Sequence, residues 1–126
     1  MNKDAVDRVK YLCKSVGHAK KTLDITEKDL ETLRKRIQQA KSEREKKILQ
    51  AVIERKERGK KEAEEIVYSF MKSVDGLENE ERNVMIQLYV KGRRWREIES
   101  LDGKLIPMSK ATIIYKRALR HMALTE

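Results

Sequence analysis

Basic side chains gather towards the C-terminus of this 126-residue chain. Residues 91–121 hold nine Lys and Arg against three Asp and Glu, a net charge of +6. Such residues neutralise nucleic-acid phosphates with release of counterions, while a few neighbouring side chains reach base edges. The chemistry that this pattern predicts is DNA contact. The candidate DNA-binding residues are Arg93, Arg94, Arg96, Ser109, Lys110, Thr112, Ile113, Lys116, Arg117 and Arg120.

Residues suited to catalysis or metal binding are sparse. His18 and His121 form neither an HxxxH nor an HxH pair, and the sequence has a single cysteine, Cys13, so it predicts no internal disulfide and no cysteine-built zinc site. GxxxxGK, GxGxxG and GxSxG motifs are missing from the sequence. We therefore predict no catalytic residue, no metal or cofactor site, and no enzymatic activity.

The overall composition describes a basic, highly charged chain. The net charge is +9, the isoelectric point about 9.7, and 40% of residues are charged. No apolar run approaches the roughly 20 residues that a membrane span needs, and the charged N-terminus does not resemble a signal peptide. We expect a soluble, cytoplasmic protein. Residues 27–65 carry 13 basic and 10 acidic residues, which favours a solvated helical face over a nucleic-acid stripe.

Apolar spacing predicts an all-α fold. The pieces between Gly17, Gly59, Gly76, Gly92 and Gly103 show helical periodicity and no sustained strand-like alternation. The clearest helical faces comprise Val6, Val9, Leu12, Cys13 and Val16, then Ala63, Ile66, Val67, Phe70, Met71 and Val74. Cys13 is expected to be a buried apolar residue rather than a reactive thiol.

The central region has two possible readings. Thr26 resembles a helix N-cap and is followed by a seam of Leu30, Leu33 and Ile37. Ser42 begins a second capping-box pattern. Either two helices meet near residues 41–42, or one long helix shifts its buried face.

The C-terminal pattern predicts a helix-turn-helix. A helix ending at Asp75-Gly76, with Gly76 in the left-handed cap conformation, precedes an acidic helix start near Glu78. A short helix follows, with Trp95, Ile98 and Leu101 on its apolar face. The final helix, capped by Ser109, would be the recognition helix. Its apolar stripe comprises Ala111, Ile114, Tyr115, Ala118, Leu119 and Met122.

Three details stay open in this region. Either Ile113 or Ile114 faces the core, which decides the side chains that point at DNA. Trp95 packs in the core or stacks on a base. The residues 102–107 pack against the helices or form a wing-like phosphate contact.

The same region resembles region 4 of sigma factors and, more closely, small phage late-gene activators of the ArpU/RinA type. The resemblance covers Val67–Met122, under half of the chain. It is carried by Leu77 with Glu81-Arg82-Asn83-Val84, Tyr89-Val90-Lys91-Gly92, Trp95-Arg96-Glu97-Ile98, and Ser109-Lys110-Ala111-Thr112. The segment between Ile98 and Ser109 is longer than a compact turn.

This resemblance implies a charged helical region over residues 1–59 and a DNA-binding helix-turn-helix domain over residues 60–126. It implies binding of double-stranded promoter DNA and activation of late phage genes through host RNA polymerase, in the cytoplasm of a bacterial host cell. Self-association through the N-terminal helices is expected, with no membrane partner. The alternatives are a DNA-packaging protein of the small-terminase kind and a coiled-coil interaction protein that binds no DNA.

Overall fold

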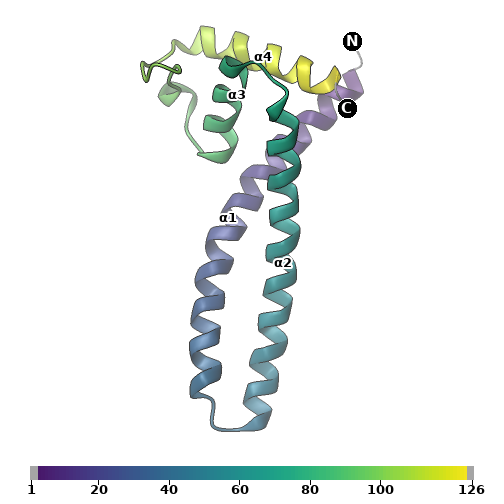
Figure 1. The fold of residues 1–126 in the computed structure, drawn as a ribbon, viewed down its shortest axis with the longest axis vertical. Helices are drawn as coiled ribbons and strands as arrows, with labels where there is room; N and C mark the ends of the chain where they lie inside the picture. Colours follow the sequence, from purple (N-terminus) through teal and green to yellow (C-terminus); the bar gives the residue numbers. More distant parts are fainter. Residues whose placement is uncertain (1–2, 125–126) are drawn as a thin grey trace.

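The computed structural model describes residues 3–124 as an elongated helical hairpin that carries a compact group of shorter helices at one end (Figure 1). The elements are α1 (Lys3–Gln39), α2 (Glu43–Asp75), α3 (Asn79–Met85), the π-helical η1 (Ile86–Val90), the 3-10 turn η2 (Trp95–Glu97) and α4 (Met108–Leu124). In this described range the β-structure amounts to one isolated bridge, between Glu99 and Leu105. The predicted all-α class is confirmed.

The central region consists of two helices and not one. α1 and α2 run antiparallel and are joined by residues 40–42 (Figure 1). Ser42 is the N-cap of α2, and its Oγ accepts a hydrogen bond from the Glu45 backbone N–H at 3.1 Å. Because this cap satisfies one of the free N–H groups of a new helix, the chain restarts helix here rather than continuing α1.

Several expected breaks are wrong. Gly17 and Thr26 both lie inside α1, and Gly59 lies inside α2. Thr26 is a buried residue of the helix interface and caps nothing. A glycine costs a helix only about 1 kcal/mol relative to alanine, which packing along two long partnered helices offsets. Gly76 does end α2, but with φ of −83°, so the predicted left-handed conformation is wrong there.

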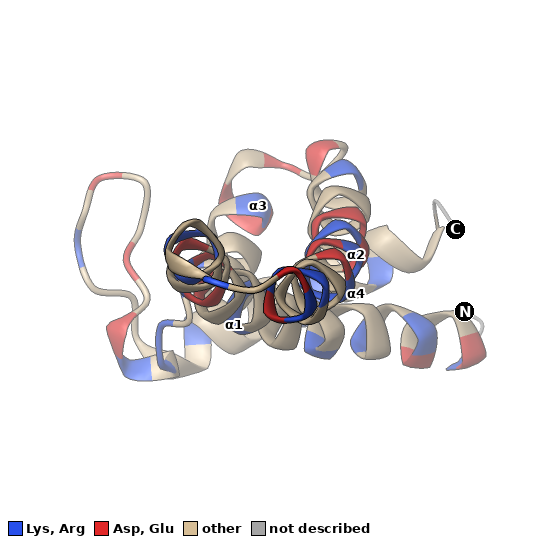
Figure 2. Ribbon diagram, turned by 90° about the horizontal axis from the view of Figure 1, so that it is seen from below, with Lys and Arg blue, Asp and Glu red and all other residues tan. Residues whose placement is uncertain are grey.

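The far part of the hairpin is held by a narrow apolar seam between exposed charges. Leu30 of α1 and Leu49 and Ile53 of α2 are all at least 95% buried. Cross-helix ion pairs join Lys56 to Asp29 at 2.9 Å, Arg34 to Glu57 at 3.2 Å and Lys60 to Glu27 at 3.7 Å. Seen from the hairpin tip, both helices carry intermixed basic and acidic residues (Figure 2). The expectation of a solvated, mixed-charge surface fits this arrangement.

The main core lies at the other end, where the start of α1 meets the C-terminal helices. Its buried residues are Ala5, Val9, Cys13, Val16, Phe70, Val74, Leu77, Met85, Ala118, Leu119, Met122 and Ala123. The cluster draws on both sides of the domain boundary expected at residue 59. Cys13 is fully buried, and this desolvation raises the pKa of its thiol to about 12. Its burial as an apolar residue is as predicted.

Candidate nucleic-acid interface

α4 has one buried face and one exposed face. Ala111, Ile114 and Ala118 are at least 98% buried, and the expected stripe of the final helix is thus in the core apart from the half-buried Tyr115. Ile114 is 2% exposed and Ile113 is 64% exposed, which settles the rotational phase of the helix. Ser109 is not the N-cap, because α4 begins one residue earlier, at Met108.

The exposed face of α4 carries unpaired positive charge. Lys110, Ile113, Lys116 and Arg120 follow one another at spacings of three, three and four residues, so they share one side of the helix. All four are exposed, and the three cations make no ion pair with any residue between 3 and 124. With a rise of about 1.5 Å per residue, this 17-residue helix is long enough to lie along a DNA major groove.

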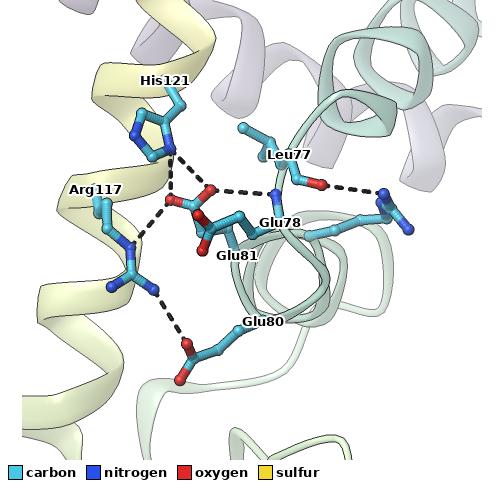
Figure 3. Close-up of polar contacts among 7 residues, drawn as sticks. Leu77, Glu78, Glu80, Glu81, Arg117 and His121 are labelled. Atoms are coloured by element: carbon cyan, nitrogen blue, oxygen red, sulfur yellow. Dashed lines mark hydrogen bonds and ion pairs between the residues drawn. The ribbon is translucent and has the colours of Figure 1, made fainter.

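Arg117 points the other way, onto α3 (Figure 3). Its Nη2 lies 3.1 Å from Glu80 Oε2 and its Nε lies 3.2 Å from Glu81 Oε2. Partial desolvation alone would lower the pKa of Arg117, but these two carboxylates outweigh it and raise that pKa. The guanidinium charge of this predicted DNA-contacting residue is therefore neutralised within the protein.

Glu81 is the centre of this contact. Its carboxylate is fully buried and accepts from the Glu78 backbone N–H at 3.3 Å, which closes the capping box of α3. The same carboxylate lies 2.8 Å from Nδ1 of His121 (Figure 3). A buried carboxylate is tolerated only when its oxygens are hydrogen-bonded. Glu81 thus fixes α4 against α3 and determines which face of α4 remains outside.

The prediction of a short helix before the final helix is wrong. Only Trp95–Glu97 is helical, as one 3-10 turn, and Ile98 is extended with ψ of 127°. Both α1 and α3 pack against α4. η1 continues α3, and residues 91–107 separate η1 from α4. The predicted apolar face also divides, since Ile98 is fully buried whereas Leu101 is 66% exposed.

A buried amide explains the extended backbone. Gln87 is 2% exposed, its Nε2 donates to the Glu99 carbonyl at 2.7 Å, and its Oε1 accepts from the Glu99 N–H at 2.9 Å. Asn83 donates to the same carbonyl at 2.8 Å. Because both backbone groups of Glu99 are engaged by side chains, they are unavailable to a helix ladder.

A tight hairpin-like turn follows and projects away from the helices (Figure 1). The Ile106 N–H donates to the Ile98 carbonyl at 2.9 Å, and Gly103 occupies the turn with φ of 80°. That positive φ is accessible to glycine at little cost. Ile106 is buried, whereas Leu105 is 68% exposed. The residues between Ile98 and α4 therefore pack at their base and expose their tip.

The tryptophan and arginines before this turn have distinct positions. Trp95 is half-buried and meets Tyr115 edge-to-face, with ring centroids 5.1 Å apart, which agrees with the packing alternative. Arg93 donates to Gln87 at 2.9 Å and pairs with Glu99 at 3.5 Å. The side chains of Arg94 and Arg96 are exposed and form no ion pair within the described range.

The polar residues that shape this site were not among the sequence candidates. For Glu81 a signal existed, because an acidic residue three positions after Glu78 at a helix start is a capping-box pattern. For Gln87 and Asn83 there was none. An amide side chain inside an amphipathic helix is ordinary, and its partner Glu99 is 12 residues from Gln87.

Comparisons with protein-family models, with curated proteins and with solved structures found no match to this chain. Within residues 3–124, no helix combines the length and apolarity needed to cross a membrane. Over the same residues, no group of three or more His, Cys, Asp or Glu side chains is arranged to hold a metal ion.

Proposed function

We propose that this protein is a sequence-specific DNA-binding transcriptional regulator that lays the outer face of α4 in the major groove of promoter DNA. The observation that carries the proposal is the row of Lys110, Lys116 and Arg120, which is exposed and unpaired within residues 3–124. Each cation can replace a counterion on a backbone phosphate. Ile113, exposed between them, offers an apolar contact of the kind that thymine methyl groups accept.

The rigidity of α4 supports this role. Base readout requires that side chains be held in a fixed register on the duplex. The buried face of α4 packs in the main core from Ala118 onwards, while Ala111 and Ile114 pack in a second cluster with Val84, Ile98 and Ile106. Arg117 and His121 bind the carboxylate of Glu81 on α3. Among the predicted residues, Arg117 thus orients the helix while Lys110, Lys116 and Arg120 meet the DNA.

Arg94 and Arg96 extend the same proposal to the segment before α4. Both are exposed and lack ion pairs within residues 3–124. They are candidates for phosphate contacts that position the protein without specifying sequence. The resemblance to late-gene activators adds host RNA polymerase as a proposed partner and α1–α2 as a proposed self-association surface.

Selection of bound sequences from a random duplex library, followed by fluorescence anisotropy on the selected duplex, tests the proposal. The triple variant Lys110→Ala/Lys116→Ala/Arg120→Ala should bind roughly 10²- to 10³-fold more weakly at about 0.1 M salt. The plot of log K against log salt has a negative slope, and each lost phosphate contact reduces its magnitude by about 0.9. The magnitude of the slope should therefore decrease by about 2.7 in the triple variant.

The matched control is Lys47→Ala/Arg55→Ala/Lys61→Ala. It removes the same charge from exposed hairpin positions that have no ion pair within residues 3–124, and it should retain most of the affinity. Equal losses of DNA affinity in the two variants would mean that the protein attracts DNA through its overall charge and not through α4. Failure of the unaltered protein to select any duplex would contradict DNA reading and favour an interaction protein, and a large ring in a mass measurement would favour a packaging role.

A further inference from the structure

A basic cleft lies where the start of α1 crosses α4. It has a volume of about 390 Å³ and is lined by Val6, Lys10, Lys116, Leu119 and Arg120. Two of its cations belong to the outer face of α4, and the third, Lys10, lies more than 100 residues earlier in the sequence. The lining therefore joins the proposed DNA-contacting helix to the N-terminal helix.

The position of Lys10 is set by the core. Its neighbours Val9 and Cys13 are buried in the main cluster, and Val6 packs against that cluster from its edge. Side chains at positions 6 and 10 lie one above the other on a helix. Lys10 is thus held beside α4 by a packed stretch of helix, and its side chain is exposed.

The lining favours an anion. It contains three cations and no carboxylate, and none of the three makes an ion pair with a residue in the range 3–124. Three positive charges left together without partners repel one another, and an entering anion relieves that repulsion. The apolar floor of Val6 and Leu119 lowers the local dielectric and strengthens charge attraction at the cleft.

We infer that this cleft binds a backbone phosphate of the duplex that α4 contacts, and that Lys10 is a DNA-binding residue of this protein. The inference rests on the proposed function. It also assigns a role to part of the positive charge of residues 1–26, which holds six basic and three acidic residues. The interface would then run from Lys110 near the start of α4 to the crossing with α1.

The test compares Lys10→Ala, Lys10→Arg and Lys21→Ala on the selected duplex over a range of salt concentrations. Lys10→Ala should reduce the salt slope by about 0.9 and the affinity about tenfold at 0.1 M salt. Lys10→Arg keeps the charge and should keep both values. Lys21→Ala removes an exposed α1 cation that does not line the cleft and should also keep both.

A second measurement distinguishes the source of the phosphate. Inorganic phosphate is titrated into the protein while backbone amide shifts of Lys10 and Arg120 are followed by NMR. Weak shifts in this titration, together with the loss of slope in Lys10→Ala, support a phosphate site used by the duplex. Saturable phosphate binding with an unchanged slope would indicate a free-anion site and overturn the inference.

The two proposals fail differently. If the unaltered protein binds a selected duplex and Lys10→Ala matches it in affinity and slope, the cleft inference is wrong and the role of α4 stands. If no duplex is selected, the proposed function itself is wrong and the cleft inference falls with it. Thermal unfolding of Lys10→Ala should match that of the unaltered protein, because exposed substitutions usually change stability by less than about 0.5 kcal/mol.

Discussion

The hairpin and the C-terminal helices use charged residues in opposite ways. In the hairpin, the half-exposed pair Lys56–Asp29 and the exposed pair Arg34–Glu57 cancel charge near the surface. In the C-terminal helices, the acidic partner Glu81 is fully buried and its cation Arg117 is drawn inward, while Lys116 and Arg120 are left unpaired in the range 3–124. Total charge therefore does not indicate which cations remain unpaired in this range, whereas the placement of the carboxylates does.

The energetic consequences of the two arrangements differ in size. An exposed pair contributes about 0–1 kcal/mol, because water competes for both partners and salt screens them. A buried carboxylate that loses its partners keeps the desolvation cost without the compensation, which amounts to about 1–3 kcal/mol or more. Substitutions in the two regions therefore compare the free-energy contribution of a surface ion pair with that of a buried carboxylate.

The largest stability effect is expected at Glu81. Glu81→Gln keeps the side-chain volume but replaces one accepting oxygen with an NH2 group that faces the nitrogen donors of Glu78, Arg117 or His121. Because a buried donor is then left without an acceptor, the free energy of unfolding should fall by about 2–3 kcal/mol. Urea unfolding followed by circular dichroism measures it. Glu80→Gln is the control, since within residues 3–124 this half-exposed carboxylate pairs only with Arg117, and it should cost under about 1 kcal/mol. Equal costs would mean that burial of Glu81 is energetically unimportant.

A smaller loss is expected at Gln87. Gln87→Leu introduces a side chain of comparable size that has no hydrogen-bonding groups, so the Glu99 N–H loses its acceptor. The free energy of unfolding should fall by about 1–2 kcal/mol. Amide hydrogen exchange should accelerate at Glu99 and Ile106, where the turn depends on this anchor, and stay slow in the hairpin. Unchanged exchange at both positions would show that the bridge between Glu99 and Leu105 forms without Gln87.

The free energy of unfolding at alkaline pH should depend on the buried thiol of Cys13. Folding raises the pKa of Cys13 from 9.0 to about 12, so the folded state holds the proton longer than the unfolded chain. This contribution is fully present below pH 9 and is lost as the pH rises towards 12, with about 1 kcal/mol lost between pH 8 and 10. Between about pH 8 and 10, the Cys13→Ala variant should lose about 1 kcal/mol less unfolding free energy than the unaltered protein. The same pH dependence in both proteins would contradict the raised pKa of Cys13.

The smallest effect is expected in the hairpin. A double-mutant cycle on Lys56→Ala and Asp29→Ala should give a coupling free energy under about 0.5 kcal/mol, decreasing with added salt. Their side chains are 39% and 42% exposed, so screening by water and salt is effective. A coupling energy that matches the cost of Glu81→Gln would remove the contrast between the two regions.

Much of the helical pattern could be predicted because it depends on near neighbours. The apolar spacings of residues 6–16 and 111–122 repeat every turn, and the capping sequence at Ser42 acts within three residues. These local signals gave the helical class and the two apolar faces. Thr26 is the exception, because this cap-like residue lies buried in the middle of α1.

The sequence by itself determined that the chain is helical and that positive charge collects around its last helix. The tertiary structure decided which charges remain available, because Arg117 is taken by Glu80 and Glu81 from a different helix while Lys10 is brought beside Lys116. It also decided that residues 98–106 are extended, through hydrogen bonds from Gln87. The physical reason is range: helical periodicity is encoded within one turn, whereas these pairings join residues from 12 to more than 100 positions apart.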